Sequence, residues 1–234
     1  MNPQDRRPGP GHIELSGERA PMRKVPWWGV LSSAAVPVLM IGGWTVAAAL
    51  QPGSFDQVTG TISALAGYGA TDRWVMTLAL LGVGIGHVGT GLALRPAAAP
   101  GRLLLITGGV ATMVVAASPL PAGGGVPARH TVAAALGFIT LALWPVFSAR
   151  RGHRAPWALR PPACAAASAV LVALLVWFGA ELNLGGGLVG LSERVIAGAE
   201  SLWPLAVVLT CCWAQSRHRA RAGPAAAPGA SLAE

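Results

Sequence analysis

The chain has 234 residues, of which 53% are hydrophobic and only 11% are charged, and its mean hydropathy is +0.55. Soluble domains carry about a quarter charged residues, so this composition excludes an ordinary soluble domain. The net charge of +8 does not indicate nucleic-acid binding, because the basic residues lie in short clusters beside apolar segments. We therefore expect an integral membrane protein with no nucleic-acid partner.

The two ends of the chain differ in composition from its middle. Residues 1–26 are charged, rich in proline and glycine, and without hydrophobic periodicity, which predicts a disordered basic tail. Residues 215–234 combine arginines with alanine, glycine and proline and are predicted to form a second disordered basic tail. Residues 27–214 then form a single transmembrane domain.

Six apolar segments in this domain are long enough to cross a bilayer, which takes about 20 residues. They lie at residues 27–50, 74–94, 103–120, 130–148, 162–180 and 192–213. Tryptophans lie near several of their ends, as is typical of the membrane–water interface. The sequence therefore predicts an all-α fold, a polytopic bundle of six transmembrane helices.

The basic residues lie in alternate gaps between the spans and so predict their orientation. Fourteen of the 17 Lys and Arg residues lie before the first span, in the second and fourth loops, or after the last span. Only Arg73, Arg129 and Arg194 lie on the other face. Because positively charged loops stay in the cytoplasm, we predict a multi-pass protein of the cell membrane with both termini cytoplasmic, N-in and C-in.

The loop at residues 51–73 holds the first candidate site residues. Residues 61–68 are predicted to form a short helix at the membrane interface. Ser63, with His130 as base and Asp56 or Asp72 as the orienting acid, has the residue types of an activated nucleophile. The alternative is that Ser63 is only a loop or cap residue, which the absence of a Gly-x-Ser-x-Gly pattern around it favours.

Glycines and one histidine mark the second span. Gly82 and Gly86 form a small-xxx-small pair, which indicates close packing inside the bundle or, alternatively, dimerisation. His87 lies about 20 Å along the helix from the predicted outer surface, too deep to share an ion with His130. We therefore predict no metal site and, without a P-loop or dinucleotide glycine pattern, no cofactor. His87 is expected to bond a neighbouring helix, with a proton relay as the alternative.

Two prolines interrupt predicted helices. Pro145 lies in the fourth span and Pro204 in the sixth, and each removes one backbone donor. The carbonyls that lose their donor are those of Leu141 and Glu200. In a membrane such carbonyls need compensating partners, which neighbouring helices or water supply.

The five acidic residues outside the two predicted tails all fall on the predicted outer face. Glu200 follows Glu193 by seven residues, so both lie on one helical face, about 10 Å apart along the axis. This places Glu200 within the outer leaflet, where an ionisable group is costly and is by default a functional hypothesis. The alternative is a structural Glu200 that is neutralised by one of the three outer arginines.

These observations define two sets of candidate site residues on the outer face. Residues with the chemistry of acids, bases or nucleophiles are the predicted catalytic set: Glu200, Glu193, His130 and Ser63. Residues with the chemistry to hold an anionic or polar group are the predicted substrate-binding set: Arg73, Arg129, Arg194, Asp56, Asp72 and Tyr68.

Several stretches resemble a known protein family. They are residues 61–76 (TISALAGYGATDRWVM), 100–105, 119–130, 137–145 and 193–204. In these stretches, and over about residues 28–214, the chain resembles the bacterial "domain of unknown function 998" family of small polytopic membrane proteins. The resemblance implies a six-helix fold and supplies no reaction. It also implies a set of family positions: Ser63, Tyr68, Arg73, Trp74, His130, Glu193, Arg194 and Trp203.

Three functions fit the sequence, and whether the protein is an enzyme stays open. The preferred hypothesis is the binding or modification of a lipid or isoprenoid amphiphile at the outer leaflet, with arginines on its head group. The second is transport of a small solute or transport coupled to protons, with Glu200 and His87 as the proton path. The third is a non-catalytic membrane scaffold. Membrane lipids are the expected partners, with a membrane protein or a second copy as alternatives.

The predicted orientation can be tested with reporter fusions. A reporter that is active only in the cytoplasm should be active when fused after Arg102 or Arg151, and inactive after Gly124 or Gly186. The basic loops cause this pattern, because they resist translocation. The reverse pattern of activity would contradict the N-in, C-in orientation.

Overall fold

Six long helices build the protein. The computed structural model describes residues 24–152 and 155–222, and within these ranges it contains helices and no strands. The long helices are α1 (Trp27–Ala49), α3 (Trp74–Ala93), α4 (Ala99–Ala116), α5 (Ala128–Phe147), α6 (Pro161–Leu184) and α7 (Val189–Ala222). All six are long and apolar enough to cross a membrane, which confirms the predicted all-α, six-span fold. The orientation of the termini stays a prediction.

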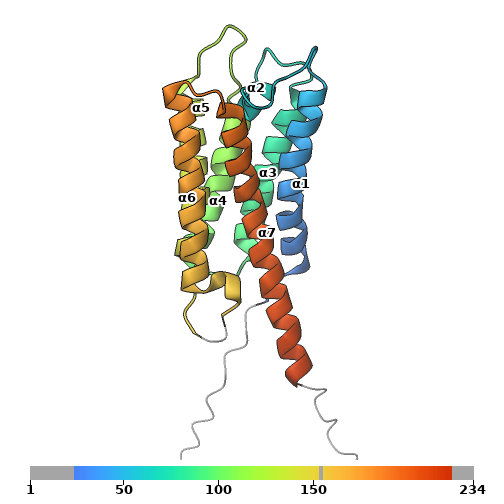
Figure 1. Ribbon diagram of the computed structural model, residues 1–234. Helices are drawn as coiled ribbons and strands as arrows, with labels where there is room; N and C mark the ends of the chain where they lie inside the picture. The colour runs from blue at the N-terminus through green and yellow to red at the C-terminus, as the bar shows by residue number, and fades with distance from the viewer. Residues whose placement is uncertain (1–23, 153–154, 223–234) are drawn as a thin grey trace, which may run out of the picture.

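The long helices run side by side and form a closed ring (Figure 1). Each spanning helix packs against the next one along the chain, and α7 closes the ring by packing against α1. The short helix α2 (Ile62–Leu65) lies at one end, which we call the α2 end. The 3-10 helix η1 (Trp157–Leu159) lies at the other, the η1 end, where α1 begins and α7 extends beyond the bundle.

Most helix boundaries lie close to the predicted ones, and two differ for clear reasons. Helix α4 begins at Ala99 rather than at residue 103, because Pro100 fits the first turn of a helix, where its missing N–H is not needed. Helix α7 continues to Ala222, so residues 215–222 of the predicted C-terminal tail are helical, which corrects that boundary. The rest of the two predicted tails, residues 1–23 and 223–234, lies outside the described residues.

The short helix α2 is tucked into the end of the bundle. The Thr61 hydroxyl caps it by accepting a hydrogen bond from the Ala64 N–H at 3.1 Å. Ile62 and Leu65 are 3% and 0% exposed and join the core formed by α1 and α3. The predicted short helix is therefore present over residues 62–65, and burial of its two large apolar side chains fixes it to the bundle. Its position at the membrane interface stays a prediction.

The glycines of α3 bring three helices into close contact. A Cβ atom on Gly82 or Gly86 would meet Leu39 or Val36 of α1. On the other side of α3, a Cβ on Gly84 would lie 2.6 Å from the Gly109 carbonyl oxygen, and a Cβ on Gly109 would lie 2.6 Å from that of Gly84. The glycines thus serve packing inside the bundle, as the preferred interpretation of the Gly82–Gly86 pair expects.

The contact between Gly84 and Gly109 predicts a strong size limit. Gly84→Ala should destabilise the protein by about 1–3 kcal/mol, because a methyl group has no room against the α4 backbone. The thermal unfolding midpoint in detergent measures this loss. Gly42→Ala on α1 is the matched control, since no atom lies within 4 Å of its added Cβ. Equal midpoints for the two variants would contradict the close α3–α4 contact.

Candidate functional site

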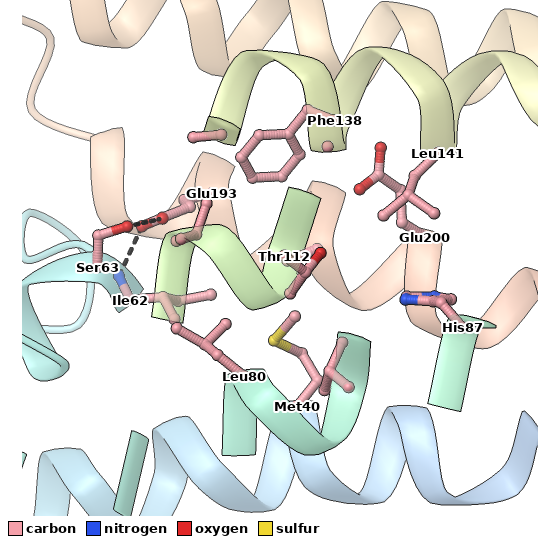
Figure 2. A pocket seen from close by; sticks show the side chains of 15 residues that line it. Met40, Ile62, Ser63, Leu80, His87, Thr112, Phe138, Leu141, Glu193 and Glu200 are labelled. Carbon is pink, nitrogen blue, oxygen red and sulfur yellow. Dashed lines mark hydrogen bonds between the residues drawn. The ribbon is translucent and has the colours of Figure 1, made fainter. Parts of the chain in front are cut away.

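A small cavity with a mostly apolar wall lies inside the ring of helices (Figure 2). Its volume is about 60 Å³, which is room for about four water molecules. Five of the six long helices and α2 contribute to its wall, and α6 does not. The lining side chains that carry polar groups are Ser63, His87, Thr112, Glu193 and Glu200. Both acids come from one face of α7, so the predicted pairing of Glu193 and Glu200 on that face is confirmed.

Glu193 closes the α2 end of the cavity by holding the first loop. Its carboxylate accepts hydrogen bonds from the Ile62 backbone N–H at 2.6 Å and from the Ser63 hydroxyl at 3.4 Å. The side chain is 5% exposed. A carboxylate at the first turn of α2 also suits the positive end of the helix. Glu193 therefore joins α7 to α2 across 130 residues of sequence.

Arg194 fastens the same loop beside Glu193. Its Nη1 donates hydrogen bonds to the backbone carbonyls of Gln57 (2.8 Å), Gly60 (2.7 Å) and Gly190 (2.9 Å). The side chain is 8% exposed, and its Nε and Nη2 have no hydrogen-bond partner within the described structure. Arg194 thus supplies the loop carbonyls with the donors that they lack. Its predicted role in substrate binding stays a prediction.

Asp56 organises the loop that Arg194 holds. Its carboxylate accepts from the Val58 N–H and the Thr59 hydroxyl, both at 2.8 Å. These hydrogen bonds lower the pKa of the Asp56 carboxyl below its ordinary value, and the nearby Arg194 charge adds to the effect. Asp56 is exposed and points its acceptors back into its own turn. The loop is therefore built around internal hydrogen bonds.

Glu200 and His87 lie at the deep end of the cavity, away from α2 (Figure 2). They are 2% and 1% exposed. Among the described residues, Glu200 Oε1 and both ring nitrogens of His87 have no hydrogen-bond partner. The His87 ring lies near the Glu200 backbone carbonyl of α7 without completing a hydrogen bond to it, so the expected bond to a neighbouring helix stays a prediction. Two buried ionisable groups, on α7 and α3, thus share one cavity.

The predicted nucleophile arrangement is not assembled. The Ser63 hydroxyl donates to Glu193, and the His130 Nδ1 lies 2.8 Å from the Ser118 carbonyl oxygen, in the α4–α5 connection. Asp56 is engaged in its own turn. Asp72, at the end of the first loop, is exposed and has a φ of 48°, a left-handed conformation that aspartate tolerates. Ser63 is therefore hydrogen-bonded to Glu193 rather than to the predicted base, His130.

The remaining candidates lie at the surface of the α2 end. The Arg73 guanidinium stacks between two aromatic rings, 4.7 Å from the centre of Tyr68 and 4.0 Å from that of Trp74. Arg129 is exposed in the first turn of α5. These arginines and Arg194 are not among the residues that line the cavity. Their predicted head-group contacts and the predicted roles of Tyr68 and Asp72 stay predictions.

Sequence reasoning did not identify Thr112 and Phe138 as part of this site. Both line the cavity, from α4 and α5. The Thr112 hydroxyl donates to the Gly108 carbonyl of its own helix at 2.9 Å. Nothing in the sequence distinguishes these two residues from others in the apolar spans. Only the packing of the helices shows which side chains share the cavity with Glu200.

Beyond the cavity, the η1 end of the bundle is filled by apolar side chains. Its core contains the fully buried Trp144, Leu94, Leu105 and Leu159, together with Val207 and Val208 of α7. Helix η1 adds Ala158 and Leu159 to this core. In this conformation the deep end of the cavity is therefore separated from the η1 end by a packed apolar layer.

The ring of apolar helices, around a small cavity that holds two acids and a histidine, defines a polytopic integral membrane protein. The family described as "Protein of unknown function (DUF998)" matches residues 33–210, and the chain belongs to this family. The match confirms the resemblance seen in the sequence. No curated protein and no solved structure matched the chain.

The anchoring of the first loop can be tested through Arg194. Arg194→Gln should raise hydrogen–deuterium exchange in residues 57–66 by about 10- to 100-fold, because charged hydrogen bonds to two loop carbonyls are lost. Arg129→Gln is the matched control, since Arg129 is exposed on α5. Equal exchange in both variants would show that Arg194 does not hold the loop.

Proposed function

We propose that this protein is a proton-coupled membrane carrier in which Glu200 binds the transported proton. The observation that supports this most directly is the cavity shared by Glu200 and His87, two buried ionisable groups of which Glu200 Oε1 and both His87 ring nitrogens lack a hydrogen-bond partner among the described residues. Carboxyl and imidazole groups inside membrane helices are the usual members of proton relays. The fold belongs to a family without an assigned activity, so the site itself carries the proposal.

The charges around Glu200 favour proton binding over a structural ion pair. Arg194 donates to loop carbonyls, Arg73 stacks on aromatic rings, and Arg129 is exposed. The alternative that one of these arginines neutralises Glu200 thus finds no hydrogen bond to support it at Oε1. A buried carboxylate without a cation is costly. Binding a proton removes this cost, and releasing it needs a change in the surroundings of Glu200.

The size of the cavity favours a proton and water over a larger ligand. Pockets for drug-sized molecules have volumes of about 300–1,000 Å³. The cavity beside Glu200 has about 60 Å³, which suits a short chain of water molecules that links Glu200 to Glu193 and Ser63. A lipid head group does not fit in this space. The lipid hypothesis preferred from the sequence is therefore replaced by its alternative, a proton-coupled transporter.

The two ends of the cavity suit a carrier rather than an open channel. Glu193 and the first loop border it at the α2 end, which the charge distribution predicts to be extracytoplasmic. The apolar core at the η1 end blocks passage to the other side. A proton bound at Glu200 then crosses only when the helices rearrange. Helix α7, which carries both acids and lacks one backbone hydrogen bond at Pro204, is the element placed to move.

Proton flux into proteoliposomes tests the proposal. Under a pH gradient with a membrane potential, wild-type protein should carry protons, and Glu200→Gln should reduce flux to the level of protein-free liposomes. The amide has the shape of the acid but cannot exchange a proton. Glu181→Gln is the matched control: Glu181 is at the end of α6, where it accepts from Trp177 Nε1 and the Leu188 N–H, outside the cavity.

Infrared difference spectroscopy after a pH change supplies a second measurement that needs no transported solute. A protonated carboxyl band that is present in wild type and in Glu181→Gln, and absent in Glu200→Gln, would support proton binding at Glu200. Absence of flux in the wild type, or full flux in Glu200→Gln, would contradict the proposed function.

A further inference from the structure

Pro204 leaves one backbone carbonyl of α7 without its helical donor. A proline has no N–H, so the carbonyl four residues earlier, that of Glu200, loses its intrahelical hydrogen bond. In hydrocarbon such a carbonyl must find another donor within the protein or from trapped water. Glu200 is 2% exposed, so this break in the hydrogen bonding of α7 lies inside the bundle.

His87 of α3 lies beside this carbonyl. Its ring is close enough to the Glu200 backbone carbonyl to interact with it, although the hydrogen bond is not completed in this conformation. Figure 2 shows the ring directed from α3 toward α7, with the Glu200 carboxyl on the same side of the cavity. A neutral imidazole has one N–H to donate. The imidazole N–H therefore lies beside a carbonyl whose usual helical donor is absent because residue 204 is proline.

The packing of α3 against α4 fixes the base of the His87 side chain. A Cβ on Gly109 of α4 would lie 3.0 Å from the His87 Cβ, so the α4 backbone packs close to that atom. The close contact between Gly84 and Gly109 sets the distance between these two helices. The position from which the His87 ring enters the cavity is therefore held by the α3–α4 contact.

We infer that His87 donates its ring N–H to the Glu200 carbonyl that Pro204 leaves free, and that this contact positions Glu200. The carbonyl and the carboxyl belong to the same residue. A donor on the carbonyl therefore fixes the backbone from which the carboxyl extends into the cavity. His87 is a positioning residue in this arrangement and ties α3 to the break in α7. Its effect on stability is independent of transport, whereas its effect on proton flux rests on the proposed function.

A double-mutant cycle of His87→Phe and Pro204→Ala tests this inference. Alanine at 204 restores the N–H that the Glu200 carbonyl needs, so the imidazole donor becomes dispensable. In the wild-type background His87→Phe should lower the thermal unfolding midpoint by at least about 2 °C, because the carbonyl is left unpaired. In the Pro204→Ala background the same substitution should change the midpoint much less. His87→Gln, which keeps an N–H donor, should rescue most of the loss.

Pro145→Ala provides the matched control background. Pro145 also lies inside a spanning helix, α5, and frees the carbonyl of Leu141 rather than that of Glu200. His87→Phe should therefore lower the midpoint as much in Pro145→Ala as in the wild type. If Pro204→Ala reduces the loss of thermal stability caused by His87→Phe and Pro145→Ala does not, the requirement for His87 depends on the missing hydrogen bond at Pro204.

The outcomes separate the inference from simpler explanations. If His87→Phe lowers the unfolding midpoint equally in the wild-type and Pro204→Ala backgrounds, the inference is overturned and His87 is only a packing residue. If His87→Phe does not lower the midpoint in the wild type, the inference is also overturned and His87 has no role in stability. If His87→Phe does not fold, folding of the double variant His87→Phe/Pro204→Ala supports the inference, and failure of the double variant overturns it.

Proton flux distinguishes failure of this inference from failure of the proposed function. His87→Phe should shift the pH dependence of flux, and Pro204→Ala should restore it in the double variant, because Glu200 is positioned again. Glu200-dependent flux that His87→Phe leaves unchanged would overturn the inference and leave the carrier intact. Thermodynamic coupling between His87 and Pro204 without flux in the wild type would contradict only the proposed function.

Discussion

The need to satisfy backbone hydrogen bonds without water governs this protein. Lipid hydrocarbon supplies neither donors nor acceptors, so spanning segments must be helices whose carbonyls and N–H groups pair internally. The structure meets this need almost everywhere in six long helices. The exceptions are therefore informative. The break at Pro204 lies beside Glu200 and His87, where side-chain atoms also lack partners.

Arginines meet the same need at the ends of the helices. At the α2 end, Arg194 donates to carbonyls of the first loop. At the η1 end, Arg102 donates to the carbonyls of Gly91 and Leu92, in the last turn of α3, and Arg150 donates to those of Pro96 and Ala97. The guanidinium group suits this task because it carries several donors in a fixed geometry. The basic residues that predict orientation thus also complete the backbone hydrogen bonding of the loops.

The cavity follows from how the ring of helices is closed. Glycine contacts draw α3 tightly against α1 and α4, whereas α7 makes only sparse contact with α3 and α5, which line the cavity with it. Space is left in front of α7, and the two acids on its inner face project into it. Glu193 is satisfied by the first loop, and Glu200 is not. One helix therefore carries a carboxyl that holds the first loop and, two turns deeper, a carboxyl whose Oε1 has no hydrogen-bond partner among the described residues.

The sequence by itself determined the six spans and the position of Glu193 and Glu200 on one face of the last helix. It also determined which carbonyls lose a helical donor to Pro145 and Pro204. Hydrophobic length and helical periodicity are local properties, so they can be read without knowing which helices meet. The placement of α2 inside the bundle and the pairing of Ser63 with Glu193 rather than His130 required the tertiary structure. So did the cavity that His87 shares with Glu200, because residues more than a hundred positions apart meet only through the rotation and packing of whole helices.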